Sequence, residues 1–378
     1  MLSEETRLQD FPSFADRVYL NTAAEGIPPK SVVDALKQYG EDKYLGMDGR
    51  LLHEKEADSL KIRAAELYGL REEDIGLSSC SSEAYNLAYA ALRLKDEDEV
   101  IINDLDFPSG MTPWLTNASP ATVKVWRSRD GILAVEDLIE LLTPKTRFVN
   151  TSLVSFYNGH QVDIEEISHA VRKFSPAMLG VDATQAIGRL RMQLDKADLI
   201  ISSTHKWLLG SHGGGLVGIA PERAEEWTVP AGGWFNLDNA FDDSLFQGVQ
   251  TKKGAASFSV GMPNYPAIYA INAGLEYILK VGVEEIEKYT HNLVQYCREG
   301  ISSLPVELLG PLNPSRPSGI IAFKHPNFEV INDELHSAGI HVMAQAGRIR
   351  VSIHGYNTYS DIEKFLDILS KALAVSAA

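Results

Sequence analysis

Two short apolar runs in the middle of the chain, each followed at once by polar residues, constrain the fold most strongly. Residues 179–181 (LGV) precede Asp182, and residues 199–201 (LII) precede the motif SSTHKW at 202–207, which contains Lys206. Apolar runs of this length, without polar alternation, are typical of strands that helices bury on both faces of a parallel sheet. Because the carboxyl ends of such strands open on one crevice, the sequence predicts that Asp182 and Lys206 face a common ligand.

Short apolar strands alternate with helical periodicity from about residue 19 to residue 218. Further strand candidates are residues 100–102, 148–151 and 215–219, and the helices expected between the strands are 83–94, 135–142 and 164–174. This alternation predicts an α/β fold, with a large, doubly wound and mostly parallel sheet.

The rest of the chain, from residue 227, has a different pattern. Residues 227–263 are rich in Gly and aromatic residues without periodicity, and we expect ordered loops near a site there. Helical stretches at 263–279 and 284–304 follow, and then the candidate strands and helices 319–323, 332–338, 350–353 and 359–373. The sequence therefore predicts an N-terminal segment (1–18), a large domain (19–262) and a smaller α+β domain (263–378).

Composition excludes several classes of protein. The formal net charge of −16 disfavours binding to nucleic acid or to an anionic membrane, because both require clustered Lys and Arg. With only Cys80 and Cys297 in the chain, neither a disulfide framework nor a multi-cysteine zinc site is available, and no metal is expected. The first residues, MLSEETR, lack the features of a secretory signal, and no apolar run approaches the roughly 20 residues of a membrane helix. We expect a cytoplasmic protein.

A lysine and an acid at neighbouring strand ends suit one cofactor in particular. A lysine amine forms a Schiff base with an aldehyde, and a carboxylate keeps a pyridinium nitrogen protonated. Lys206 and Asp182 are therefore candidates for holding pyridoxal 5'-phosphate (PLP), and His205 joins them in the candidate catalytic set. Taken singly, Lys206 reads as a surface lysine and Asp182 as a helix cap.

Further residues fit the same cofactor. Gln185, three residues after Asp182, is a candidate donor to the phenolic oxygen of the cofactor, or else a helix-surface residue. The run SSCSSE at 78–83 precedes a predicted helix, where hydroxyls and free N–H groups favour a phosphate. Ser81 and Ser82 are the candidates there, with plain N-capping as the alternative. Ser203 and His205 are expected to add phosphate contacts, and a packed core histidine is the alternative for His205.

Phe107 and Arg350 complete the predicted site. Phe107, in the motif DFPS at 106–109, follows a strand and is a candidate to stack on the pyridine ring, although such an aromatic is more often core. Arg350 begins a strand of the small domain and can clamp a substrate carboxylate through two hydrogen bonds. Arg348 shares that strand face, and one of the two arginines can be a solvent ion pair. We assign the clamp to Arg350.

These motifs resemble the class V aminotransferase family of PLP enzymes, which has fold type I. The resemblance runs from VYLNTAA at 18–24 to YNT at 356–358, and it is greatest to the isopenicillin N epimerase-like, kynureninase-like and cysteine desulfurase-like members. It implies the roles given above for Lys206 and its partners, places Asn21 near the substrate pocket, and implies a homodimer with active sites at the interface. Trp114, after the DFPS motif, is a further candidate to contact substrate.

The chain departs from the family pattern at several points. Cys80 stands where a glycine is common in the phosphate loop. Met262 replaces a threonine that reaches the phosphate of the partner subunit, so that contact is lost or replaced. The segment 343–347 (MAQAG) has no cysteine, which disfavours a desulfurase that stores persulfide on a mobile thiol.

The protein, not PLP, selects which bond at the substrate Cα or Cβ breaks. We expect a lyase that acts on an amino acid and cleaves a Cβ–S bond in cysteine or a modified cysteine. A class V aminotransferase and an amino-acid epimerase remain alternatives, because all three reactions begin with the same lysine and acid. An alternative of a different class is a non-catalytic, PLP-binding regulatory module.

Overall fold

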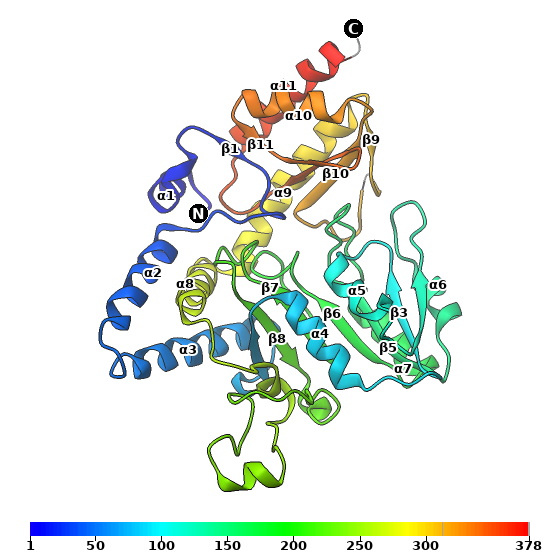
Figure 1. The fold of residues 1–378 in the computed structure, drawn as a ribbon. Helices are drawn as coiled ribbons and strands as arrows, with labels where there is room; N and C mark the ends of the chain where they lie inside the picture. Colours follow the sequence, from blue (N-terminus) through cyan, green and yellow to red (C-terminus); the bar gives the residue numbers. More distant parts are fainter. Residues whose placement is uncertain (312, 377–378) are drawn as a thin grey trace.

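A seven-stranded sheet forms the centre of the larger unit, in a computed structural model that describes residues 1–311 and 313–376 (Figure 1). The strand order is β2-β8-β7-β6-β5-β3-β4, and β8 alone runs against its neighbours. The bounds are β2 (Ile75–Ser78), β3 (Glu99–Asn103), β4 (Thr122–Trp126), β5 (Thr146–Ser152), β6 (Met178–Asp182), β7 (Leu199–Ser203) and β8 (Gly215–Ile219). The mostly parallel sheet expected from the apolar runs is therefore confirmed.

Helices cover both faces of this sheet, which explains why its strands are apolar on both sides. Ile101 and Ile200 point into a core shared with helices of one face, and their neighbours Val100 and Leu199 point into a second core on the other face. The helices of this unit are α2 (Lys30–Lys43), α3 (Arg50–Tyr68), α4 (Ser81–Leu92), α5 (Pro108–Leu115), α6 (Val135–Leu141), α7 (Ile164–Phe174) and α8 (Tyr265–Val281).

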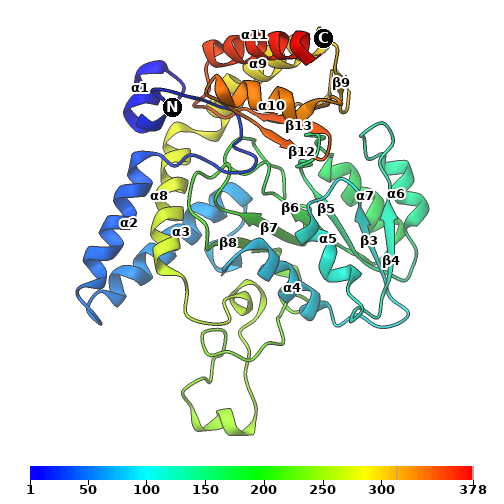
Figure 2. The same cartoon turned by 45° about the horizontal axis from the view of Figure 1, so that its top comes forward.

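A smaller unit lies against one end of the sheet domain (Figure 2). Its antiparallel sheet has the order β12-β13-β10-β9. The strands and helices are β9 (Glu307–Leu308), β10 (Ile320–Lys324), β12 (Met343–Gln345), β13 (Arg348–Ser352), α9 (Val283–Ser302), α10 (Phe328–Ser337) and α11 (Tyr359–Ser376). These helices and strands share a core of their own.

The N-terminal segment contacts both units, and the amino group of Met1 donates to the Tyr277 hydroxyl of α8 at 2.9 Å. Strand β1 (Val18–Tyr19) pairs in parallel with β11 (Ile340–His341), and Arg7 of α1 (Glu4–Asp10) pairs with Asp361 at 3.0 Å. Short 3-10 helices lie at Pro12–Phe14, Glu72–Asp74, Pro221–Arg223, Asp243–Gln247 and Gly254–Phe258. The predicted domain boundary between residues 262 and 263 stays a prediction. Helix α8, which follows that boundary, packs on α2 and α3 of the larger unit, whereas α9 packs on α11 of the smaller unit.

The segment between β8 and α8 contains the expected irregular structure, interrupted by 3-10 helices, and part of it projects away from the sheet (Figures 1 and 2). Among the described residues, no helix has the length and apolar character needed to cross a bilayer.

Candidate functional site

A cavity of about 440 Å³ opens at the carboxyl ends of the central strands, between the two units. This is the size and place of a small-molecule site in an open α/β sheet. Its lining combines residues from the sheet domain, the N-terminal segment and the smaller unit, including Ala23, Ser81, Ser82, Phe107, Phe156, Asp182, Gln185, Ser203, His205, Lys206, Met343, Gln345, Arg348 and Arg350.

Lys206 follows β7 and extends its amine into this cavity. The residue is only 9% exposed, and its Nζ lies 5.1 Å from the centroid of the Phe107 ring. Burial lowers the pKa of the Lys206 amine to about 8, with help from the positive charge of Arg350 and against the opposing charge of Asp182. About a tenth of the amine is therefore neutral, and nucleophilic, at pH 7.

Asp182 ends the neighbouring strand β6, and two hydrogen bonds fix its carboxylate. Its Oδ1 accepts from the backbone N–H of Thr184 at 2.8 Å, and its Oδ2 accepts from the hydroxyl of Tyr85 at 3.1 Å. A carboxylate has about four acceptor positions, so Asp182 can still accept a proton-bearing ring nitrogen. Tyr85, which lies one helical turn after Ser81 on α4, was not identified from the sequence. This spacing could have identified it as a neighbour of the site.

The N-terminus of α4 forms the polar end of the cavity. The Ser203 hydroxyl donates to the Ser81 hydroxyl at 3.0 Å, and Ser82 lies beside them. The helix is capped by Cys80, whose Sγ accepts from the N–H of Glu83 at 3.4 Å, and not by either serine. Free N–H groups and two hydroxyls at a positive helix end fit a phosphate.

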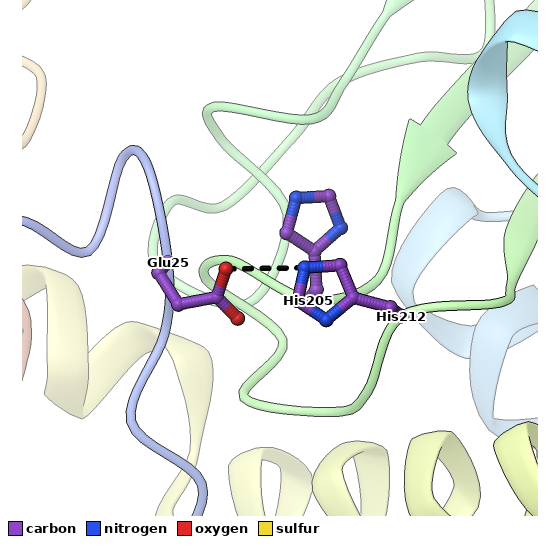
Figure 3. Close-up of side chains that lie close together, drawn as sticks. All are labelled: Glu25, His205 and His212. Carbon is purple, nitrogen blue, oxygen red and sulfur yellow. Dashed lines mark ion pairs between the residues drawn. The ribbon is translucent and has the colours of Figure 1, made fainter.

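His205 lies in a three-residue cluster near the same end of the cavity (Figure 3). Its ring stacks on that of His212 with centroids 4.4 Å apart, and His212 Nε2 pairs with Glu25 Oε2 at 3.1 Å. One ring nitrogen from each histidine and one carboxylate oxygen of Glu25 lie within 4.8 Å of one another, although Glu25 and His212 are exposed. Burial, Lys206 and His212 together lower the pKa of His205 to about 4, so its ring is neutral at neutral pH.

Gln185 and Phe107 both reach the cavity. The Gln185 Nε2 donates to the carbonyl of Ala23 at 3.1 Å, which leaves its second N–H unassigned. Phe107 is 44% exposed and meets Phe156 edge to face, with centroids 5.0 Å apart. An exposed phenylalanine in a cavity wall fits a stacking role better than a core role.

Two arginines of β13 line the wall that the smaller unit contributes. Arg350 Nη1 donates to the carbonyl of Phe156 at 2.9 Å, while its Nε has no partner among the residues that the structure describes. Burial and the charge of Arg348 lower the pKa of Arg350 to about 10. The structure thus brings Arg350 to the cavity, as predicted from the sequence, together with Arg348.

Trp114 and Asn21 do not line the cavity. Trp114 lies in the core: it packs on Phe148 with centroids 4.9 Å apart, and its Nε1–H donates to the carbonyl of Gly110 at 2.9 Å. The structure therefore does not bring Trp114 to the cavity, because its ring is buried between α5 and the sheet. Asn21 forms an isolated bridge with Ser352 beside the cavity.

Asp106 is a buried acid near the site that sequence reasoning passed over within the DFPS motif. Its Oδ1 accepts from the N–H of Ser152 at 2.7 Å, and burial raises its pKa to about 7. It lies in the loop after β3, directly before Phe107, and links this loop to the end of β5.

The donor set of the cavity fits PLP. An amine with a lowered pKa, a fixed carboxylate and a hydroxyl-lined helix N-terminus match the aldehyde, ring nitrogen and phosphate of that cofactor. The buried Nε of Arg350, which has no partner among the described residues, leaves an anion-binding edge for a substrate.

Comparison with known proteins gives consistent results. A family model described as aminotransferase class-V matches residues 18–365. A probable cysteine desulfurase of Pyrococcus abyssi is 25% identical over 399 residues, covering 98% of this chain and 97% of the relative. The apo structure of a cysteine desulfurase from Thermococcus onnurineus superposes with a TM-score of 0.88 at 24% identity, covering 99% of this chain and 100% of the other.

A second solved protein with this fold is the cystine C–S lyase C-DES. Its complex with the reaction product cysteine persulfide has a TM-score of 0.86 at 20% identity, covering 95% of this chain and 99% of C-DES. A mutant of C-DES carries glycine covalently linked to the PLP cofactor, with a TM-score of 0.87 at 21% identity over 96% of this chain and 98% of that one.

Proposed function

The chain belongs to the aminotransferase class-V family, and from that membership we propose that it is a PLP-dependent lyase that cleaves the Cβ–S bond of cysteine or a cysteine derivative. The single observation that carries the proposal is the meeting of Lys206 and Asp182 in one cavity, at the ends of adjacent strands. The names of the relatives, cysteine desulfurases and a cystine C–S lyase, support the choice of bond.

Each part of the cofactor has a candidate partner in the cavity. Lys206 would hold PLP covalently through its amine, Asp182 would hold the proton of the ring nitrogen, and Gln185 would donate to the phenolic oxygen. Ser81, Ser82, Ser203 and His205 would bind the phosphate, with Phe107 against the ring. When bound, PLP withdraws electrons from the substrate Cα and so stabilises the negative charge that forms there.

The remaining chemistry belongs to residues of this chain. Arg350 would bind the substrate α-carboxylate and so fix the orientation of the bonds at Cα. Lys206 Nζ, with its lowered pKa, would take the proton from Cα, after which the Cβ–S bond breaks and the sulfur leaves as a thiol. With water the balance is R–S–CH2–CH(NH3+)–COO− + H2O giving RSH, pyruvate and NH4+.

The cysteine positions favour release of the sulfur over its storage on the protein. The segment 343–347, whose Met343 and Gln345 line the substrate side of the cavity, offers no thiol. Cys297 is buried in α9, where burial raises its pKa to about 12. The Sγ of Cys80 caps α4 on the phosphate side.

The test is to load the purified protein with PLP and supply a panel of L-amino acids, including cysteine and S-alkyl cysteines. Equal amounts of pyruvate, ammonia and thiol or sulfide support the lyase. A keto acid that retains the side chain indicates an aminotransferase, inversion at Cα without net product indicates an epimerase, and bound PLP with no product indicates a non-catalytic module. Lys206→Ala should abolish the visible band of lysine-bound cofactor, and a band that persists contradicts the role of Lys206.

We also propose a homodimer in a reducing compartment such as the cytoplasm. Met47, 75% exposed, and Met262, 45% exposed, face one surface hollow of about 490 Å³, and Tyr44 nearby is 93% exposed. Apolar side chains gathered in this way are typical of a protein interface. Both cysteines are free, which fits a reducing compartment. Light scattering at several protein concentrations tests the dimer.

A further inference from the structure

Two guanidinium groups occupy one wall of the cavity, where a single substrate carboxylate needs only one. Arg348 and Arg350 alternate with Ile349 on β13, so both point to the cavity while Ile349 points into the core of the smaller unit. They are 4% and 3% exposed, so both charges are almost completely withdrawn from water.

Neither arginine has an acidic partner in the described part of the chain. Arg350 donates to the carbonyl of Phe156, and Arg348 lies over the Tyr157 ring, 4.2 Å from its centroid, with Phe156 at 5.6 Å. The Nε atoms of both are buried, and neither has a hydrogen-bond partner within residues 1–311 and 313–376. Burial lowers the pKa of Arg348, and burial with the charge of Arg348 lowers that of Arg350. Burying two like charges in this way is unfavourable unless an anion compensates both.

The two arginines take different positions along the wall of the cavity. The charge of Arg350 contributes to the lowered pKa of Lys206, which suits Arg350 to the carboxylate attached to Cα. Arg348 pairs across the sheet with Gln345, an exposed residue that also lines the cavity, whereas Arg350 pairs with the less exposed Met343. Arg348 therefore lies toward the open side, where the end of a substrate side chain would extend.

We propose that Arg348 forms a second anion subsite, with Gln345 beside it, and that the substrate is an amino acid whose side chain ends in an anionic group such as a carboxylate. This inference rests on the proposed function, because it takes Arg350 as the partner of the α-carboxylate. A neutral side chain would leave the Arg348 charge buried and uncompensated, so the site discriminates against it. Within the lyase reaction, the anion lies on the leaving sulfur fragment.

A binding experiment tests the subsite without any turnover. PLP-loaded protein is titrated calorimetrically with glutarate and with pentanoate, which have the same chain length but two and one carboxylates. Glutarate should bind at least about tenfold more tightly, the size of one charge-assisted hydrogen bond. Arg348→Met should abolish that preference and leave pentanoate binding unchanged, and Arg348→Lys should retain part of it. Lys324→Met, on the strand position paired with Arg348 but outside the cavity, is the matched control.

A preference for glutarate that is missing in the wild-type protein, or that survives Arg348→Met, overturns the proposal. An activity arm then separates it from the proposed function, using S-carboxymethyl-L-cysteine and its neutral amide. If both compounds are cleaved at equal rates, the proposed lyase activity is supported and the proposed anion subsite is contradicted. If neither compound is cleaved but glutarate is preferred in a way that depends on Arg348, the anion subsite is supported and the lyase activity is contradicted.

Discussion

The indole N–H of Trp207 donates a 2.6 Å hydrogen bond to Oε1 of Gln185, and both residues are almost completely buried. Because the Oε1 of Gln185 is occupied in this way, its Nε2 is directed to Ala23 and the cavity. Trp207 follows Lys206 directly, and Gln185 lies three residues after Asp182. The bond therefore joins the two strand-end motifs and fixes which end of the Gln185 amide a ligand meets.

Replacing Trp207 by Phe should reduce the free energy of unfolding by about 1–3 kcal/mol, because a buried acceptor loses its donor. The affinity for PLP should also fall, since the amide of Gln185 is then free to turn. Denaturant unfolding of the apoprotein and a PLP titration measure the two effects.

Trp227→Phe is the matched control. Trp227 is also fully buried, but its indole N–H has no acceptor among the described residues, so its replacement removes no hydrogen bond. Equal losses of stability in the two variants would contradict the importance of the Trp207 bond.

The pKa of Lys206 predicts a pH-dependent stability of the apoprotein. Between pH 8 and 10.5 the unfolded chain carries the proton while the folded protein, with its pKa of about 8, does not. Stability therefore rises with pH through this window, and below pH 8 the full penalty for burying the charged amine is present. Relative to Lys206→Met, the wild-type free energy of unfolding should rise by on the order of 3 kcal/mol.

The same pKa sets the rate at which the apoprotein captures PLP, since only the neutral amine attacks the aldehyde. The rate of appearance of the visible band should increase with pH, with a midpoint near 8. Arg350→Gln should move the midpoint upward, because the Arg350 charge lowers the pKa, and Asp182→Asn should move it downward. A midpoint that stays near 10.5 in the wild-type protein would refute the effect of burial.

The pKa of Asp106 predicts that the stability of the protein falls as the pH rises, in a lower pH range than for Lys206. The Asp106 pKa of about 7 exceeds that of an unfolded aspartate, so the folded protein binds the extra proton between pH 4 and 7 and its stability falls as the pH rises. Asp106→Asn removes the titration, and its amide oxygen can still accept from Asn150 Nδ2, which donates to Asp106 Oδ2 at 3.4 Å. The wild-type stability relative to this variant should fall by a few kcal/mol from pH 4 to pH 7 in denaturant unfolding.

The parts of the fold that sequence patterns predicted well are those where burial leaves no ambiguity. Strands β6, β7 and β8 are continuous apolar runs because helices cover both faces, and β8 was predicted at its observed bounds. The edge strands β2 and β4 were missed. In β4 (TVKVW) the polar Lys124 interrupts the run and its first residue is exposed, so the segment lacks a continuous apolar signal.

The structure places Lys206 and Asp182 in one cavity, where the strand ends indicated by the sequence meet, but the sequence left the aromatic residues ambiguous. Phe107 reaches the cavity and Trp114 does not, although both belong to one motif, because only tertiary packing against Phe148 decides which ring is covered. The sequence was also insufficient to choose between Arg350 and Arg348, and Arg350 alone was assigned to the clamp. Strand alternation places both on one face, but it does not show that this face is buried.

Gly26 lies where the N-terminal segment passes the lysine loop most closely, and it provides a last prediction. Its N–H donates to the carbonyl of His205 at 2.8 Å, and a Cβ added at Gly26 would lie 1.9 Å from the carbonyl oxygen of Lys206. Because this oxygen belongs to the backbone, it cannot move aside as a flexible side chain could. Gly26→Ala must therefore displace either the N-terminal segment or the loop that carries Lys206. We expect a loss of at least 1–3 kcal/mol in the free energy of unfolding and slower capture of PLP. Gly261→Ala is the control, because a Cβ there meets no atom within 4 Å. If Gly26→Ala captures PLP as fast as the control, the position of Lys206 does not depend on this contact.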